Sequence, residues 1–301
     1  MEAVATRAGF VGLAGRPNVG KSTLANAIVG EKVAIVSDRP QTTRRAIRGI
    51  ATDPGETRQL VLIDLPGVQR PRDHLTQRMQ RTVEHELGDA DVVLLVIDAS
   101  QGVGPGDRFI ARVLLGARRE VPVVCAVNKC DRLRNPDTAR VLVGVEGLEV
   151  VDEIFPVSAR RGTGIAPLVD RLVELVPQGP LLYPPEERTD VPREVWLAEL
   201  IREQVLHRTR EEIPHSVEVK VEEMARREDG LVEVHAEVWA ENNSQKRILV
   251  GKAGSMVREV GKAARRELER ELGARVFLDL QVKVRRRWRR DEALLDRLGI
   301  E

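Results

Sequence analysis

The chain is poor in aromatic residues, cysteines and long hydrophobic runs. Only 3% of its 301 residues are aromatic and only two are cysteines, Cys125 and Cys130. Neither cysteine has Cys or His neighbours at metal-ligand spacing, so we expect free thiols in a reducing cytosol rather than a disulfide framework or a zinc site. No apolar run approaches the roughly 20 residues that a membrane-spanning helix needs, and no secretory signal is recognisable. We therefore expect a cytoplasmic protein with an aliphatic core.

The charge has no excess of one sign over the whole chain. Lys and Arg number 48 against 47 Asp and Glu, which gives a net charge of +1. Apolar residues make up 42% of the sequence and charged residues 32%, an ordinary balance for a globular protein. The length predicts about two domains.

Continuous aliphatic runs alternate with helical patterns in the first part of the chain. We predict strands at 9–14, 60–64, 91–97, 122–127 and 154–157, and helices at 22–29, 74–87 and 106–118. Buried strands that alternate with helices are typical of a mostly parallel sheet covered on both faces. The pattern predicts an α/β domain over residues 1–180.

The pattern changes after a segment rich in proline. Residues 176–192 contain five prolines, and we place a linker at 181–192. Beyond the linker, we predict alternating, half-buried strands at 216–222, 231–239 and 275–284, and helices at 193–210, 255–272 and 291–298. Residues 193–301 are therefore expected to form a smaller α+β domain.

A phosphate-binding loop follows the first predicted strand. Residues 15–22 match G-x-x-x-x-G-K-[ST], with a strand before the motif and a helix after it. In such a loop the backbone N–H groups and the helix N-terminus surround phosphate oxygens, the lysine reaches the outer phosphates, and the hydroxyl contacts Mg²⁺. The predicted nucleotide contacts are Gly15, Arg16, Pro17, Asn18, Val19, Gly20, Lys21, Ser22 and Thr23.

Two further segments are expected to surround the metal and the terminal phosphate. Asp64 ends a predicted strand, and Gly67 follows it at D-x-x-G spacing, where its backbone N–H can approach that phosphate. The polar loop 37–45 holds Thr42 and Thr43, either of which can reach the metal when a third phosphate is present. We favour Thr43. The predicted Mg²⁺ ligands are Ser22, Thr43 and Asp64; the predicted catalytic groups are Lys21, Thr43 and Gly67; and Leu65, Pro66 and Val68 complete the nucleotide contacts of this segment.

A third motif indicates that the base is guanine. Asn128, Lys129 and Asp131 form N-K-x-D at the end of a predicted strand, and Ser158 and Ala159 follow the next strand. A carboxylate at Asp131 can accept hydrogen bonds from N1–H and the exocyclic amine of guanine. Adenine lacks this pair of donors and would leave the carboxylate unpaired. The sequence therefore predicts GTP and GDP as ligands, and hydrolysis of GTP.

The residue after D-x-x-G is apolar. Many GTPases place a Gln here to orient the attacking water, whereas this chain has Val68. An apolar side chain cannot orient water. We expect slow intrinsic turnover that relies on Mg²⁺, the phosphate loop, backbone groups or a partner.

The second predicted domain contains the sequence GKAG at 251–254. It fits G-x-x-G, the loop with which KH domains clamp a nucleic-acid backbone, although the motif alone is weak and is more often a plain loop between helices. Charge supports the first interpretation, because residues 246–290 hold 15 Lys and Arg against 5 Asp and Glu, whereas residues 181–245 hold 8 against 16. The predicted RNA contacts are Gly251, Lys252, Ala253, Gly254, Ser255, Arg258, Arg285, Arg287 and Trp288, the last by stacking on a base.

These motifs together resemble the bacterial Era GTPases over essentially the whole chain. The resemblance rests on GRPNVGKSTLAN, PQTTRR, DLPGV and NKCD, and above all on EIPHSVEV at 212–219, ILVGKAGSMVREVG at 248–261 and KVRRRWRRDEALLDRLG at 283–299. It implies a Ras-like GTPase domain joined to a type II KH domain. One departure is Leu65, where the family usually has Thr.

The resemblance also implies a function. Era-like proteins bind the 3′ end of 16S ribosomal RNA, assist small-subunit assembly and associate peripherally with the inner membrane. It further implies a potassium ion at Asn18, and we expect a monomer. Two alternatives remain open from the residues: an RNA-binding scaffold whose nucleotide site barely turns over, which Val68 would allow, and a GTPase whose second domain binds protein or anionic lipid through its arginines.

Overall fold

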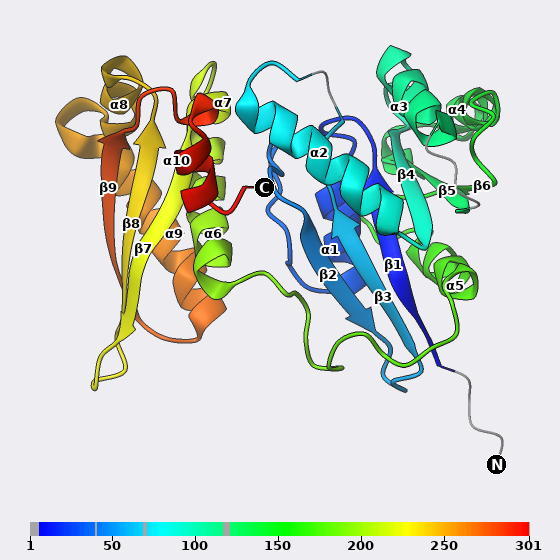
Figure 1. The fold of residues 1–301 in the computed structure, drawn as a ribbon, viewed down its shortest axis with the longest axis horizontal. Helices are drawn as coiled ribbons and strands as arrows, with labels where there is room; N and C mark the ends of the chain where they lie inside the picture. The colour runs from blue at the N-terminus through cyan, green and yellow to red at the C-terminus, as the bar shows by residue number, and fades with distance from the viewer. Residues whose placement is uncertain (1–5, 40, 69–70, 117–120, 301) are drawn as a thin grey trace. The chain divides into compact units, whose positions relative to one another are not determined.

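The computed structural model describes residues 6–39, 41–68, 71–116 and 121–300. The chain divides into two compact units (Figure 1). The main boundary along the sequence falls between Asp190 and Val191, and two short segments, 37–39 and 73–75, group with the second unit. The segment predicted as a linker is therefore part of the first unit up to Asp190.

The first unit is built on a six-stranded sheet in the order β2-β3-β1-β4-β5-β6. Five strands are parallel, and β2 pairs antiparallel with β3 at one edge. The strands are β1 (Arg7–Ala14), β2 (Ile47–Thr52), β3 (Arg58–Asp64), β4 (Val92–Asp98), β5 (Val123–Asn128) and β6 (Glu153–Pro156). The predicted α/β class with a mostly parallel sheet is confirmed.

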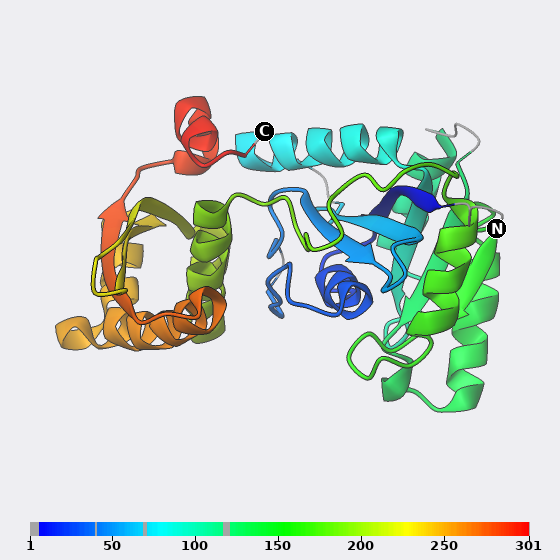
Figure 2. The ribbon, with the colours of Figure 1, turned by 90° about the horizontal axis from the view of Figure 1, so that it is seen from below.

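Helices cover both faces of this sheet, because successive strand residues point to opposite sides and both sides are apolar. They are α1 (Lys21–Val29), α2 (His74–Asp89), α3 (Pro105–Gly116), α4 (Asn135–Glu146) and α5 (Ile165–Leu175). Figure 2 shows α1 and α2 on opposite faces. The predicted helical residues 117–118 lie outside the described residues.

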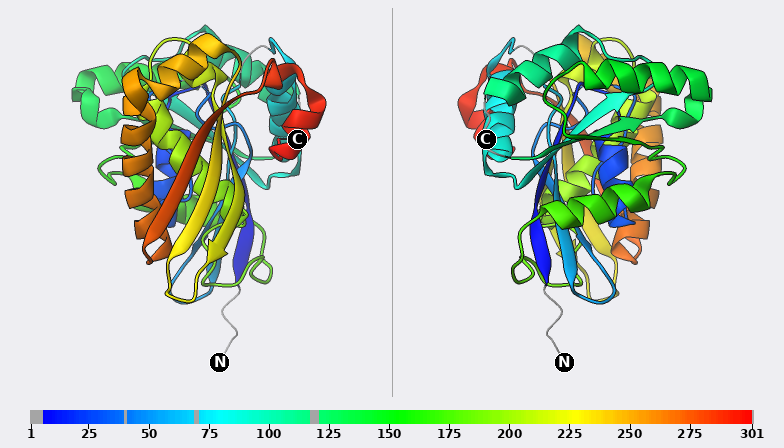
Figure 3. Two further views of the ribbon diagram at one scale, coloured as in Figure 1. Left: turned by 90° about the vertical axis from the view of Figure 1, so that its left-hand side faces the viewer. Right: turned by 90° about the vertical axis from the view of Figure 1, so that its right-hand side faces the viewer.

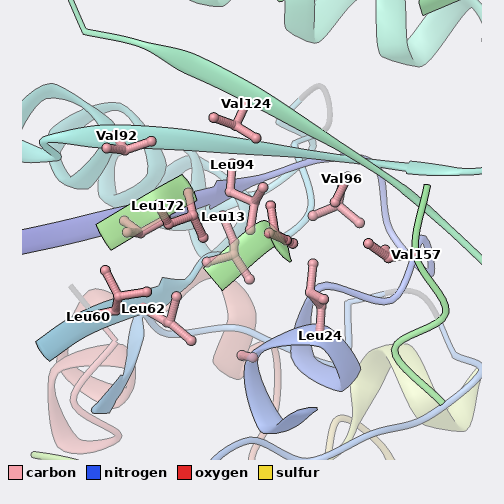
Figure 4. Close-up of a cluster of buried hydrophobic side chains, with 14 of the residues drawn as sticks. Leu13, Leu24, Leu60, Leu62, Val92, Leu94, Val96, Val124, Val157 and Leu172 are labelled. Atoms are coloured by element: carbon pink, nitrogen blue, oxygen red, sulfur yellow. The ribbon is translucent and has the colours of Figure 1, made fainter. Parts of the chain in front are cut away.

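Two buried clusters fill the space between sheet and helices. On one face, Leu62 and Leu94 of the sheet pack with Leu24 of α1 and Leu172 of α5 (Figure 4). On the other face, strand residues such as Leu95 pack with residues of α2, α3 and α4. Because each of the five parallel strands contributes to both clusters, the carboxyl ends of these strands are held in one row.

The sequence prediction gives no residue range for one strand and two α-helices of the first unit, namely β2, α4 and α5. The segment before Asp190 also has a structural role that composition did not show. The buried amide of Gln59 accepts hydrogen bonds from the backbone N–H of Leu182 and Tyr183 and donates one to the Tyr183 carbonyl. Proline-rich residues therefore pack along β3 as part of the domain.

The second unit is an α+β domain with a three-stranded sheet in the order β7-β8-β9. Strands β7 (Glu218–Arg226) and β8 (Val232–Ala240) are antiparallel, and β9 (Val276–Val284) pairs parallel with β8. Helices α9 (Ser255–Leu272) and α6 (Arg193–Arg208) pack together against one face of this sheet, and Figure 3 (left) shows α9 beside β9. The remaining α-helices of this unit in the described residues are α7 (Ile213–Ser216), α8 (Asn243–Val250) and α10 (Glu292–Arg297). The sequence prediction lacked α7 and α8.

None of the helices in the described parts of the chain combines the length and the hydropathy needed to cross a membrane.

Candidate functional site

The predicted nucleotide contacts of the first unit lie at the carboxyl ends of its strands. The phosphate loop follows β1, Asp64 ends β3, Asn128 ends β5, and Ser158 follows β6. In an open α/β sheet, ligands bind at this edge, where the loops of neighbouring strands converge. The fold thus brings together segments that are more than 140 positions apart in the sequence.

The phosphate loop bends through backbone conformations that favour glycine. Gly20 has a φ of 100°, and a Cβ there would lie 2.4 Å from Nδ2 of Asn128. Asn18 also adopts a left-handed conformation, with a φ of 65°. Val19 is buried, while Thr23 continues into α1, whose first residue is Lys21. The loop ends at a helix N-terminus whose free N–H groups favour an anion.

Lys21 is buried inside the curve of this loop. Its Nζ donates hydrogen bonds to the carbonyls of Gly15, at 3.1 Å, and Arg16, at 3.2 Å. Burial lowers the pKa of Lys21 to about 8, against the opposing charge of Asp64. A phosphate beside Nζ would counter the desolvation and stabilise the charged amine.

Three oxygen-bearing side chains converge beside the loop. The Ser22 hydroxyl donates to Oδ2 of Asp64 at 2.6 Å, Oγ1 of Thr43 lies 3.2 Å from the same oxygen, and the two hydroxyls are 3.1 Å apart. Oδ1 of Asp64 is buried without a hydrogen-bond partner. Burial raises the pKa of Asp64, although Lys21 and the two hydroxyls oppose that shift.

This cluster fits a magnesium ion. Hydroxyl and carboxylate oxygens are the hard ligands that Mg²⁺ prefers, and the unpaired buried Oδ1 can be satisfied by an ion or by its water. The described residues include no group of three or more His, Cys, Asp or Glu side chains that could hold a metal. Of the two adjacent threonines, the structure places Thr43 beside Ser22 and Asp64.

The segment after Asp64 lies against the phosphate loop. A Cβ on Gly67 would lie 2.7 to 3.0 Å from Pro17 atoms, and the Val68 amide donates to the Gly15 carbonyl at 3.4 Å. Only a glycine allows this close approach of backbone to backbone. Leu65, Pro66 and the Val68 side chain are buried, the last among apolar residues of α2 and α3.

Asn128 connects the phosphate loop with the predicted guanine loops. Its Nδ2 donates to the Val19 carbonyl at 3.0 Å, and its Oδ1 accepts from the Ala159 amide at 3.0 Å. Ser158 donates to Oδ1 of Asp131 at 2.6 Å, and this hydrogen bond holds the pKa of the carboxyl below its usual range. Asp131 is thus kept ionised as a hydrogen-bond acceptor.

The GKAG loop of the second unit lies between α8 and α9. Gly251 and Gly254 have φ values of 72° and 77°, and Ala253 has a φ of 50°. A Cβ on Gly251 would lie 2.7 Å from the Met256 amide nitrogen, whereas a Cβ on Gly254 would lie 4.0 Å from Arg258 Nε. The side chains of Lys252, Ala253 and Ser255 are exposed. The loop presents a tight, accessible turn ahead of a helix N-terminus.

The Arg258 side chain stabilises this loop through hydrogen bonds to two of its carbonyls. Its Nη2 donates to the Ala253 carbonyl at 2.6 Å and its Nε to the Gly254 carbonyl at 3.1 Å. Arg258 remains exposed, so the same guanidinium faces solvent beside the loop.

The prediction for Trp288 is wrong. The indole is fully buried, and its N–H donates to the Ser216 carbonyl at 2.9 Å. A ring with no exposed face cannot stack on a base, so Trp288 anchors the C-terminal segment instead.

The Arg285 side chain interacts with two residues of its own domain. Its guanidinium lies 5.5 Å from the centre of the Trp239 ring and 3.0 Å from a Glu237 oxygen. Of the three predicted residues in the basic run, Arg287 has an exposed side chain.

Comparisons with known proteins identify a GTPase domain and a KH domain in this chain. Residues 10–129 match the family model described as 50S ribosome-binding GTPase, and residues 212–289 match the KH domain model. The chain is 46% identical to GTPase Era of Mycolicibacterium smegmatis over 97% of its length and 98% of the relative, and 44% identical to GTPase Era of Carboxydothermus hydrogenoformans, with 97% of each chain covered.

Two solved structures of Era proteins are similar to this chain over 98% of its length. A variant of Aquifex aeolicus Era bound to GDP and AlF₄⁻ is 33% identical, with a TM-score of 0.92 over 98% of this chain and 99% of that one. Era in complex with MgGDPNP and nucleotides 1506–1542 of 16S ribosomal RNA is 34% identical, with a TM-score of 0.93 and the same coverage. The chain belongs to the Era family of GTPases.

Packing accounts for Leu65 and for the apolar residue at position 68 in this Era-family chain. Leu65, found where the resemblance led us to expect Thr, is buried in the core with Val68. Both side chains therefore point away from the nucleotide edge, and the apolar residue in the Gln position is part of the core.

Sequence reasoning missed several polar residues at the same edge of this Era-family domain. Asp98 ends β4, and its carboxylate accepts a hydrogen bond from Lys129 Nζ at 2.7 Å. Asp107 in the first turn of α3 pairs with Arg16 at 2.8 Å. Asp98 could have been predicted from the sequence, because it ends a buried strand as Asp64 does.

Proposed function

We propose that this chain is a GTP-controlled switch that binds the 3′ end of small-subunit ribosomal RNA and assists assembly of the small subunit. The observation that carries the proposal is the presence, in one chain, of the Ser22–Thr43–Asp64 cluster and an exposed GKAG loop. The related Era complex, which contains both MgGDPNP and a 16S fragment, supports the same pairing of ligands.

Within the nucleotide site, each residue has a distinct role. Lys21 and the loop amides bind the phosphates, Ser22, Thr43 and Asp64 hold Mg²⁺, and the Gly67 amide faces the terminal phosphate. Asp131 and the Ala159 loop read guanine. When bound, Mg²⁺ supplies charge neutralisation at the phosphates. Because Val68 cannot orient water, intrinsic hydrolysis is slow.

The switch operates through the segment that holds Thr43. Without the third phosphate, Thr43 has fewer ligands to order it, so GTP and GDP favour different populations of this loop. We propose that the GTP-bound population binds RNA and that hydrolysis releases it. The second unit would contact RNA through Gly251, Lys252, Ala253, Gly254, Ser255, Arg258 and Arg287.

Three finer points are part of the proposal. A potassium ion at Asn18 would assist hydrolysis, so turnover should be faster in potassium than in sodium buffer; equal rates would contradict this. The basic residues near the C-terminus suit loose contact with an anionic membrane surface, tested by flotation with anionic vesicles. We expect a cytoplasmic monomer, tested by fractionation of cells and by light scattering.

The decisive experiment measures affinity for a single-stranded RNA matching the 3′ end of 16S ribosomal RNA, at fixed salt. Wild-type protein is compared with GDP and with a non-hydrolysable GTP analogue. A loop variant, Lys252→Asp with Ala253→Asp, adds negative charge at two exposed positions, and Asp tolerates the left-handed conformation at 253. Gly251 is left unchanged, because its close contact with Met256 makes substitution a test of folding.

A matched control is Arg226→Asp with Arg275→Gln. These exposed residues give the same change in net charge at the opposite end of the sheet, where β7 ends and β9 begins. We expect the analogue to favour binding and the loop variant to lose about tenfold or more in affinity, the control losing far less. Equal losses would mean that general charge, and not this loop, binds RNA. No binding by wild type, together with binding to anionic vesicles, would favour lipid.

A further inference from the structure

The stretch from the last residue of β4 to the first turn of α3 belongs to none of the predicted nucleotide motifs, yet it contacts two of them. We call residues 98–107 the bridging segment. At one end, Asp107 is fully buried; its Oδ1 accepts from Arg16 Nε at 2.8 Å, and its Oδ2 accepts from the Gly104 amide at 2.8 Å. The backbone of Arg16 is part of the phosphate loop, so this end of the segment holds that loop.

The other end of the bridging segment holds the guanine loop. Asp98 is 1% exposed, and its Oδ2 accepts from Lys129 Nζ at 2.7 Å. The same Nζ donates to the carbonyl of Asn18 at 2.6 Å. The Asp98 carboxylate is itself fixed, because Oδ1 accepts from both the amide and the hydroxyl of Ser100.

Gln101 joins the two ends. Its Nε2 donates to Asp98 Oδ2 at 3.0 Å, and its Oε1 accepts from Arg16 Nη1 at 3.2 Å. The hydrogen bonds therefore run without a break from Asp107 through Arg16, Gln101 and Asp98 to Lys129. Buried carboxylates are costly unless they are paired, so this chain of contacts is a strongly specified arrangement.

Two further features support this arrangement of contacts. A Cβ on Gly106 would lie 2.5 Å from Cδ of Arg16, so α3 can pass this close to the arginine only with glycine there. Burial would raise the pKa of Asp98, but the hydrogen bonds from Lys129 and Ser100 outweigh it and hold the pKa below its usual range. The carboxylate at the centre of the network is thus stabilised in its charged form.

From these contacts we infer that the bridging segment sets the spacing between the phosphate loop and the guanine loop, with Asp98, Gln101 and Asp107 as positioning residues for GTP. The inference rests on the proposed guanine site at Asp131. A nucleotide occupies both loops at once, so its affinity depends on their separation. The affinity of a ligand that occupies only one of the loops does not depend on their separation. Fixing the separation before binding lowers the ordering cost that the nucleotide would otherwise meet.

This difference provides the test. Binding of GDP, guanosine and pyrophosphate is measured on the full chain, the last two by competition with a fluorescent GDP. Asp98→Asn removes the charge at the centre of the network, and Gln101→Ala breaks the connection at an exposed position while leaving the two ion pairs in place. Asp170→Asn, which breaks an exposed ion pair with Arg58, is the matched control.

We expect GDP to dissociate about tenfold faster from Asp98→Asn, because a hydrogen bond to a charged partner is lost, and about threefold faster from Gln101→Ala. Guanosine and pyrophosphate should bind as in wild type, and Asp170→Asn should match wild type throughout. Parallel weakening of all three ligands would mean that the residues only stabilise the domain, and unchanged GDP dissociation would mean that the segment positions nothing; either result overturns the inference. If wild type fails to prefer GDP over ADP, the proposed guanine site itself is wrong.

Discussion

The chain holds two short loops bracketed by glycines, one before α1 and one before α9, and their surroundings differ. The phosphate loop is tied by side chains distant in sequence, such as Asn128 and Lys129, and its lysine is buried. The GKAG loop is tied by its own neighbours, above all Arg258, and Lys252 is exposed. The first is a site built before its ligand arrives; the second is an accessible surface.

This difference matches the two ligands proposed. Hydrolysis needs fixed donors around charge that develops in the transition state, so the loop must be held from several sides. Contact with a nucleic-acid backbone needs close approach and positive charge, which a locally stable turn supplies. A short loop bracketed by glycines is therefore proposed to support hydrolysis in the first unit and RNA binding in the second.

The largest expected contrast comes from removing each loop's lysine. Lys21→Met should lower the rate of GTP hydrolysis by at least about 100-fold, because a buried donor to the phosphates is lost. Lys252→Met should weaken RNA binding by only about fivefold, the order expected of one exposed charge. Phosphate release and RNA titration measure the two effects. Comparable losses in both assays would remove the distinction between a built site and a surface.

Substituting one glycine in each loop gives the next largest contrast. Gly20→Ala forces a methyl group to within 2.4 Å of the Asn128 amide, so we expect GDP affinity to fall about 30-fold or more, from strain plus a displaced hydrogen bond. In Gly254→Ala the new methyl group would lie 4.0 Å from Arg258 Nε, an ordinary contact, so the main cost is the left-handed backbone and RNA affinity should fall about fivefold. Equal effects in the two titrations would indicate that local backbone strain alone sets both costs.

Substitution of Val68 tests whether a polar residue at this position makes GTP hydrolysis faster. We expect Val68→Gln to lower the free energy of unfolding by about 1–3 kcal/mol, since its amide would enter an apolar cluster with Val83 and Ile110. We expect no acceleration of hydrolysis. Calorimetry and phosphate release measure both quantities, with Val68→Leu as an apolar control. Faster hydrolysis would show that the side chain can leave the core and reach the phosphates.

The smallest effect concerns the buried indole of the second unit. Trp288→Phe leaves the Ser216 carbonyl without its donor, and should cost about 1 kcal/mol of stability without changing RNA affinity. Arg287→Gln is the counterpart, because its exposed side chain should affect RNA binding and not stability. If Trp288→Phe weakens RNA binding while the melting temperature is unchanged, the indole does contact the base.

The locations of the nucleotide contacts could be predicted because each motif lies at the end of a recognisable strand. Predictions from pattern were less successful where a side chain's surroundings decide its role. Trp288 lies among arginines in sequence, but in the folded domain it is buried against Ser216. Elements with weak local patterns, such as β2 and α8, were also missed, because tertiary packing rather than periodicity stabilises them.

The sequence by itself determined the class of the fold, the family, and the set of groups available to bind phosphate, metal and guanine, because these follow from short spacings and from apolar periodicity. Only the tertiary structure decided which residues act together. Thr43 joins Ser22 and Asp64, Val68 points into the core, and Gln101 links Arg16 with Asp98. Such contacts join residues on different strands and loops, and their distances are set by the packing of the sheet and its helices, which no local spacing specifies.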